Sequence, residues 1–228
     1  MATTQRSHYP TGADLLESIK ANRRMAMIFV LGFTLLILAA VLAQHFANTT
    51  AGSEPAFTGL AVEPPRELPP LELQRADGGI WSSAELNGRL AMFFFGYTNC
   101  PDVCPLTLSR AKQAIAQLGD DAARVDFYFV TVDPERDTPR RLGMYVGQFD
   151  PTITALTGTP AQLEAAMAAF GVVAQQVPTG SEAGYAVDHT ATSFLIDDGA
   201  IRLLYGHDTP AADLAADLRA ILAERPRA

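Results

Sequence analysis

The sequence of 228 residues has few of the features that mark several common protein classes. It contains only two cysteines, Cys100 and Cys104, which excludes a disulfide-rich secreted scaffold and a four-cysteine zinc site. Basic residues are also scarce, because 17 Lys and Arg stand against 25 Asp and Glu, giving a formal net charge of −8. No binding to nucleic acid is therefore expected, since its phosphates require a basic surface.

The chain is too apolar to be a disordered acidic protein. Hydrophobic residues make up 48% of it and charged residues 18%. Such a composition can fill the core of one domain of ordinary size. The sequence therefore predicts one globular domain with additional segments.

The strongest shift in composition is an uncharged apolar run, Met25–Ala43. About 20 such residues cross the hydrocarbon core as a helix, so the run predicts a single transmembrane helix at 25–43. Arg23 and Arg24 precede it, which by the positive-inside rule keeps segment 1–24 in the cytoplasm. The alternatives are a cleaved signal peptide and a twin-arginine signal, but the run is long for either.

Residues 44–70 are rich in Pro, Gly, Ser and Thr and show neither helical nor strand periodicity, which predicts a flexible linker. The folded domain is then 71–228, on the far side of the membrane from the N-terminus. We interpret that side as a bacterial periplasm, with the chain anchored in the inner (cytoplasmic) membrane. Nothing in the sequence suggests a repeat.

Strand and helix patterns alternate through 71–228, which predicts a three-layer α/β domain with a mixed sheet. The continuous apolar run Leu90–Phe95 is typical of a strand buried on both faces. The other predicted strands are Leu71–Gln74, Ile80–Trp81, Val125–Val132, Ala191–Ile196 and Ile201–Tyr205, and the predicted helices are Cys104–Leu118, Thr138–Phe149, Pro160–Phe170 and Ala211–Leu222. Segment 171–185 has no clear pattern and is expected to be a mobile loop.

Both cysteines fall between a buried strand and a helix, in the segment 96–105, GYTNCPDVCP. Open α/β sheets hold their sites at this carboxyl edge of the strands. Pro105 fits only the first turn of a helix, so Cys104 is expected at the helix N-terminus, where the dipole lowers a thiol pKa. Two sulfurs this close can form a disulfide or bind a soft metal ion together. A purely structural disulfide would be weak here, because the loop is short.

Four histidines offer a third ligand: His8, His45, His189 and His207. His8 is expected on the other side of the membrane, and His45 lies on the linker. His189 directly precedes the predicted strand Ala191–Ile196. If that strand runs antiparallel to Leu90–Phe95, its beginning meets the edge that carries the cysteines. His189 is therefore the candidate ligand, although a lone histidine beside a strand is more often a structural residue.

Three blocks of this sequence resemble the signatures of the Sco/SenC family of membrane-anchored copper proteins. They are GYTNCPDVCPLTL at 96–108, TVDPERDTP at 131–139 and VDHTATSFLID at 187–197. The resemblance implies a thioredoxin-like fold with a central mixed sheet flanked by helices, in which Cys100, Cys104 and His189 bind Cu(I) and Cu(II). It also brings Asp133 and Asp137 to the same edge, where they either support the metal ligands or cap the helix from Thr138 and fix its loop.

The resemblance further implies a metallochaperone, not an enzyme, that helps to mature the dinuclear copper (CuA) centre of cytochrome c oxidase. The oxidase subunit carrying that centre is the expected partner, with another copper chaperone and a thioredoxin-like reductant as further candidates. Copper and a Cys100–Cys104 disulfide exclude each other, so metal loading depends on redox state. Two other functions stay open: a membrane-tethered thiol-disulfide oxidoreductase that reduces the oxidase cysteines, and a redox or copper sensor. A peroxidase is less expected, because the sequence has only this one close cysteine pair.

Overall fold

A long helix and an α/β domain make up the structure of this chain, a computed structural model that describes residues 12–50, 57–180 and 184–225. Contacts within the chain divide it into two units, Met1–Ala56 and Phe57–Ala228. The helix α1, Gly12–Thr50, belongs to the first unit. Every other described element belongs to the second.

The predicted transmembrane helix is not confirmed. The run Met25–Ala43 lies inside α1. Among the described residues, no helix combines the length and the apolar character that a membrane span requires.

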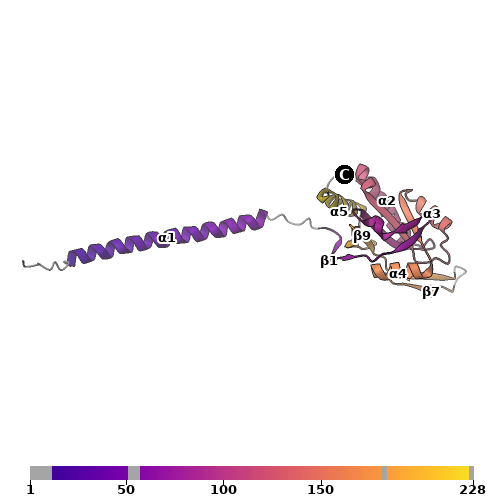
Figure 1. The fold of residues 1–228 in the computed structure, drawn as a ribbon, viewed down its shortest axis with the longest axis horizontal. Helices are drawn as coiled ribbons and strands as arrows, with labels where there is room; N and C mark the ends of the chain where they lie inside the picture. The colour runs from indigo at the N-terminus through magenta and orange to yellow at the C-terminus, as the bar shows by residue number, and fades with distance from the viewer. Residues whose placement is uncertain (1–11, 51–56, 181–183, 226–228) are drawn as a thin grey trace, which may run out of the picture. The chain divides into compact units, whose positions relative to one another are not determined.

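An eight-stranded mixed sheet forms the centre of the second unit (Figure 1). Its strand order is β1-β10-β9-β4-β5-β6-β2-β3. The central strand β4 pairs in parallel with β5 and antiparallel with β9. The strands are β1 (Leu60–Glu67), β2 (Glu72–Arg75), β3 (Ile80–Ser82), β4 (Leu90–Gly96), β5 (Val125–Thr131), β6 (Ile153–Thr157), β9 (Ser193–Asp197) and β10 (Ala200–Tyr205). The predicted mixed sheet is confirmed, and the antiparallel pairing beside β4, on which the placement of His189 was conditional, is present.

Helices cover both faces of this sheet (Figure 1). The helices are α2 (Val103–Leu118), α3 (Pro139–Gly147), α4 (Pro160–Phe170) and α5 (Ala211–Glu224). Side chains of β4 alternate, so Phe94 packs in the cluster with α2, α3 and α5, and Phe95 in the cluster with α4. β4 is therefore buried between two core layers, which explains its uninterrupted apolar sequence.

The predicted linker is wrong for its last part, because Leu60–Glu67 forms β1 and pairs antiparallel with β10. This strand lies at the edge of the sheet and is mostly exposed. An edge strand needs no apolar alternation and tolerates proline, here Pro64 and Pro65. The sequence therefore resembled a linker although it forms part of the sheet.

Two further features were missed. The strand β6 follows α3 and pairs in parallel with β5. Segment 171–185, expected to be a mobile loop, contributes instead to a separate two-stranded sheet of β7 (Ala174–Pro178) and β8 (Tyr185–His189). Residues 181–183 between these strands lie outside the described part. The hairpin has exposed polar residues on much of its surface, so its sequence lacks the apolar run that marks a buried strand.

A buried carboxylate joins the start of the second unit to its last helix. Asp217 of α5 is 4% exposed and accepts hydrogen bonds from the backbone N–H of Thr58 and Gly59 and from the Tyr205 hydroxyl, at 3.2, 3.0 and 3.1 Å. Burial, followed by the charge of Asp217, raises the pKa of Tyr205. Asp217 therefore holds the chain just before β1 against the domain.

We expect Asp217→Asn to lower the free energy of unfolding by about 1–3 kcal/mol, because an amide cannot accept all three bonds and leaves buried donors unpaired. Urea denaturation of the full chain measures this. The exposed Asp120→Asn removes the same charge and should leave the urea midpoint unchanged. Equal midpoints for both variants would contradict the anchoring role of Asp217.

Candidate metal centre

The two cysteines lie in the turn that joins β4 to α2. After β4 ends at Gly96, the N–H of Cys100 donates to the Tyr97 carbonyl at 3.2 Å, and α2 begins at Val103. Cys104 is thus the second residue of the helix, as the sequence predicted, and Pro105 lies in the first turn. The turn directs both side chains toward the edge of the sheet where parallel strands β4 and β5 end.

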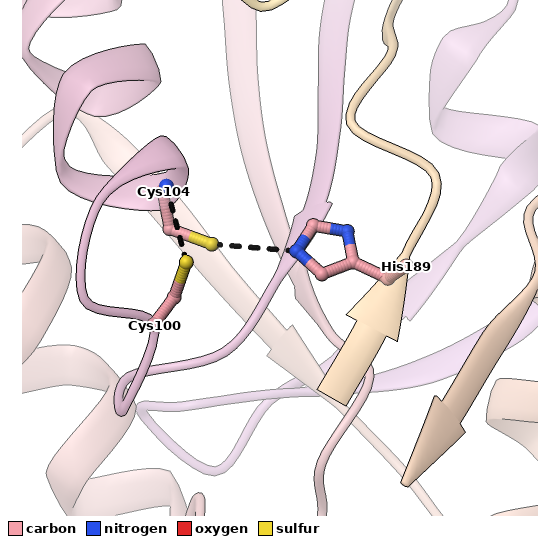
Figure 2. A group of neighbouring side chains, drawn as sticks. All are labelled: Cys100, Cys104 and His189. Carbon is pink, nitrogen blue, oxygen red and sulfur yellow. Dashed lines mark hydrogen bonds between the residues drawn. The ribbon is translucent and has the colours of Figure 1, made fainter. Parts of the chain in front are cut away.

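His189 reaches the cysteines from the end of β8. The Nε2 atom of His189 lies 3.6 Å from the Cys104 Sγ, and the Cys104 N–H lies 3.4 Å from the Cys100 Sγ (Figure 2). One ligand atom from each of the three residues falls within 4.8 Å of the others. The structure therefore brings together the three residues singled out from the sequence.

The His189 ring is held in one orientation. Its Nδ1 atom lies 3.0 Å from the Thr190 carbonyl oxygen, and only a protonated Nδ1 can donate to that oxygen. Nε2 is then the unprotonated nitrogen, with its lone pair on the side of the cysteines. The rings of Tyr97 and Phe94 meet the imidazole edge to face, with centroids 5.8 and 6.3 Å away. The imidazole is therefore prepared to act as a neutral ligand.

The expected pKa assignment within the cysteine pair is wrong. The thiol of Cys104 donates to Cys100, which, with weaker help from backbone N–H groups, lowers the pKa of Cys100 to about 3. The same hydrogen bond, followed by complete burial, raises the pKa of Cys104. At Cys104 the hydrogen bond to Cys100 and burial together outweigh the helix dipole, whereas Cys100 is partly exposed. The reduced pair thus has an accessible thiolate at Cys100 and a buried thiol at Cys104.

Neither cysteine is in a disulfide in this structure, so the Cys100–Cys104 disulfide stays a prediction. A strand glycine gives the buried thiol its space. A Cβ atom on Gly96 would lie only 2.8 Å from the Cys104 Sγ and 3.0 Å from the rings of Phe94 and Phe129. The close approach of β4 to Cys104 therefore depends on the absence of a Cβ atom at Gly96.

Asp133 and Asp137 are both buried close to the centre, but they contact different partners. Asp137 accepts from the Thr98 N–H and hydroxyl, at 3.1 and 2.5 Å, and from the Thr131 hydroxyl at 2.8 Å. It therefore fixes the start of the cysteine turn to the end of β5. Asp133 binds Arg136 and Tyr185 instead.

Neither aspartate caps the helix α3. Thr138 is its N-cap, with its hydroxyl accepting from the Arg141 N–H at 3.3 Å. Helix capping is therefore wrong for both aspartates, whereas both fix loops beside the ligands; a supporting role toward the metal ligands themselves stays a prediction.

A groove leads from solvent to Cys100. One wall comes from the cysteine turn, with Pro101 and Val103, and the other from the hairpin, with Val177 and Ala186. His189 lines the groove as well. The Cys100 side can therefore be approached by another molecule, while Cys104 is enclosed.

The other histidines do not join this group within the described residues. His207 is exposed and follows β10. His8 lies outside the described residues, and the side chain of His45 does as well.

Three residues beside the ligands were not identified from the sequence: Gly96, Tyr97 and Arg136. Gly96 and Tyr97 lie within the cysteine block that the sequence singled out, but their roles depend on packing that the sequence does not show. Arg136 acts on the hairpin, which the sequence did not predict.

Comparison with known proteins gives consistent matches. Residues 62–223 match the SCO1/SenC family. The SCO2-like protein of Rickettsia prowazekii is 35% identical over 129 residues, which is 56% of this chain and 63% of that protein. The chain thus spans less than two thirds of the length of the curated relatives compared first.

Two solved structures extend the match to the fold. ScoI of Bradyrhizobium japonicum, solved with copper bound, is 36% identical, has a TM-score of 0.63, and the match covers 67% of this chain and 98% of that one. Apo Sco1 of Thermus thermophilus is 35% identical, with a TM-score of 0.68 over 75% of this chain and 99% of that one. The predicted thioredoxin-like fold with a central mixed sheet is confirmed.

Proposed function

Because the chain belongs to the SCO1/SenC family, we propose that it is a copper metallochaperone that binds copper through Cys100, Cys104 and His189. The observation that carries this proposal is the set of two sulfurs and one imidazole nitrogen within 4.8 Å of one another. The copper is cargo, and the protein has no catalytic role in this function.

The chemistry of the three donors fits copper. Thiolate sulfur is a soft ligand that selects Cu(I), and imidazole suits copper as well. Cys100 is already a thiolate, and the Nε2 of His189 is unprotonated, so only Cys104 has to lose a proton on binding. Cu(II), which heads the divalent affinity order, can use the same donors. A relative solved with copper bound supports the assignment.

The proposed destination of the copper is the dinuclear CuA centre of cytochrome c oxidase. This step rests on the family resemblance of the three sequence blocks. The oxidase subunit that carries the centre would be the partner, approaching through the groove beside Cys100. Another copper chaperone as donor and a thioredoxin-like reductant for the Cys100–Cys104 pair complete the proposal.

A second candidate function is thiol-disulfide exchange with the cysteines of the oxidase. The asymmetry of the pair favours it, because an accessible thiolate beside a buried thiol is the arrangement of an attacking and a resolving cysteine. A sensor of redox or copper state would use the same three residues. Exchange needs both cysteines but not His189, which separates it from copper delivery.

The location of the domain is a further proposal and rests on sequence alone. Arg23 and Arg24 before the apolar run Met25–Ala43 favour attachment to the inner membrane with the domain in the periplasm. Protease treatment of intact spheroplasts should then digest the domain, and recovery of an intact chain would contradict this location.

We expect the reduced full chain to bind one Cu(I) tightly. The His189→Ala substitution should weaken this binding by more than about tenfold. The variant loses one of three donors while the thiols remain. Anaerobic titration against a chromophoric Cu(I) chelator measures both affinities. His207→Ala, at an exposed site outside the group, is the matched control and should behave as the parent.

The Cys100→Ser, Cys104→Ser double variant gives the baseline for this titration. If the parent binds Cu(I) no more tightly than the double variant, the copper function is wrong. If the parent binds tightly and His189→Ala binds equally well, the cysteine ligands stand and the assignment of His189 is wrong. Disulfide exchange that persists in His189→Ala would support the second candidate function, because exchange needs the two cysteines and not the imidazole.

A further inference from the structure

The strand that carries His189 is not part of the main sheet. Among the strands that the structure describes, β8 pairs with β7 alone, in an antiparallel register that runs from Ala174 opposite His189 to Pro178 opposite Tyr185. A two-stranded hairpin is marginal on its own. The position of the imidazole relative to the cysteines therefore depends on what holds this hairpin to the domain.

Arg136 binds the free edge of β8. Its Nη1 donates to the Tyr185 carbonyl oxygen at 2.7 Å, and the guanidinium lies 3.7 Å from the centre of the Tyr185 ring. Val187, on the same strand, is buried in the same core cluster as Tyr97. Arg136 thus occupies part of the edge where a third strand would pair.

Arg136 is itself fixed by a buried carboxylate. Its Nε donates to Oδ2 of Asp133, whose side chain is fully buried, and the Tyr185 hydroxyl donates to Oδ1 of the same residue at 2.8 Å. Asp133, Arg136 and Tyr185 therefore form a closed group, which we name the hairpin clamp. Because the ion pair is desolvated, loss of one partner leaves a buried charge uncompensated.

The clamp reaches His189 through an aromatic ring. The guanidinium carbon of Arg136 lies 5.7 Å from the centre of the Tyr97 ring, and that ring meets the His189 ring at 5.8 Å. Tyr97 is 3% exposed, so it has little room to move independently. Arg136 thus contacts the beginning of β8 directly and its end through Tyr97.

The chemistry of the clamp requires arginine in particular. A planar guanidinium can stack on one ring while its separate N–H groups bind a carboxylate and a carbonyl oxygen. A lysine ammonium could keep the ion pair with Asp133 but could not also stack on Tyr185 in this way. Other contacts also hold the hairpin: Val187 is buried, and Thr190 bonds to Val173 at its base.

We propose that Arg136 is a positioning residue for His189, which holds β8 so that Nε2 faces the cysteine pair. The part of this inference that concerns copper affinity deepens the proposed copper function and rests on it. Its structural part, that Arg136 restrains the hairpin, is independent of any metal. The clamp then sets how much of the time the third donor is in place beside the two sulfurs.

Hydrogen-deuterium exchange of the reduced, metal-free full chain tests the structural part. In Arg136→Gln, peptides covering 185–189 should exchange about tenfold faster or more, because the hairpin opens more often. Arg136→Lys should show a smaller increase, and Arg140→Gln, which removes the same charge from an exposed site nearby, should show none. Peptides from β4 and β5 report whether the domain stays folded.

Tyr185→Phe provides a milder variant if Arg136→Gln unfolds the domain. It removes the bond to Asp133 but leaves a ring beneath the guanidinium, so exchange at 185–189 should rise without change in β4. The proposal is wrong if 185–189 exchanges at the parental rate in both Arg136→Lys and Tyr185→Phe while β4 is unchanged.

A double-mutant cycle with Cu(I) tests the positioning role. Arg136→Gln should weaken Cu(I) binding about fivefold or more in the parent, but should have no effect in the His189→Ala background, because its effect passes through His189. A merely structural residue would cause the same loss in both backgrounds, and that result would overturn the positioning role. If the parent binds no Cu(I), the proposed function fails while the exchange experiment still decides the role of Arg136.

Discussion

The rate at which iodoacetamide alkylates Cys100 in the reduced, metal-free chain should be almost constant between about pH 5 and about pH 8. The thiolate is the reactive form of a cysteine. With its pKa lowered to about 3, Cys100 is already fully deprotonated throughout this range, so raising the pH adds no further thiolate. An ordinary exposed thiol would react about tenfold faster for each added pH unit in this range. Mass spectrometry of quenched samples measures the rate at this single site.

The main cause of this low pKa is the hydrogen bond that Cys104 donates, and removing it should restore an ordinary pH profile. In Cys104→Ala the pKa of Cys100 should rise toward the usual value of a thiol, so the alkylation rate should climb steeply with pH. His189→Ala leaves this hydrogen bond in place and should change the profile less. A steep profile in the parent, or a flat one in Cys104→Ala, would contradict this account.

Gly96→Ala should destabilise the domain by about 1–3 kcal/mol, which is the usual cost of overpacking a core. The added methyl group would lie 2.8 Å from the Cys104 Sγ, and the rings of Phe94 and Phe129 block its other sides. Either the thiol moves away from His189 or β4 shifts within the sheet. Urea denaturation measures the loss, and the Cu(I) titration should show a lower affinity as well.

A second glycine provides the control. A Cβ on Gly143, inside α3, would meet only the Cβ of Ala76 at 3.6 Å, an ordinary contact. Gly143→Ala should therefore keep or raise the free energy of unfolding, because alanine favours a helix by about 1 kcal/mol over glycine. If both variants were as stable as the parent, the close approach at Gly96 would not limit the site.

The central part of the fold could be predicted because its physical signals are local. The apolar run of β4 and the amphipathic stretch of α2 are visible in a window of a few residues. Edge elements lack such signals, and β1 is exposed and contains two prolines. The hairpin of β7 and β8 is mostly exposed or half-buried and lacks the apolar run that marks a buried strand. β1 depends on the assembled sheet and the hairpin on its contacts with the domain, so local patterns did not reveal them.

The candidate ligands could also be predicted, whereas their electrostatics could not. The spacing of Cys100 and Cys104 and the place of His189 before a strand are properties of the chain. The assignment of the thiolate depends on which sulfur is buried, and burial of Cys104 arises from packing against β4 and β5. The contribution of Arg136 depends on a hairpin that the sequence did not show. Geometry therefore decided the roles of residues whose positions were already known.

The three donors are separated very unequally along the chain, and this affects when a site can exist. Cys104 and His189 are 85 positions apart, whereas Cys100 and Cys104 are only four apart. During synthesis from the N-terminus, the two sulfurs emerge long before the imidazole. An incomplete or unfolded chain can offer copper only the cysteine pair, and closing the loop to His189 costs chain entropy until the sheet forms. Tight copper binding therefore requires the folded domain. Bound copper in turn stabilises that domain against unfolding.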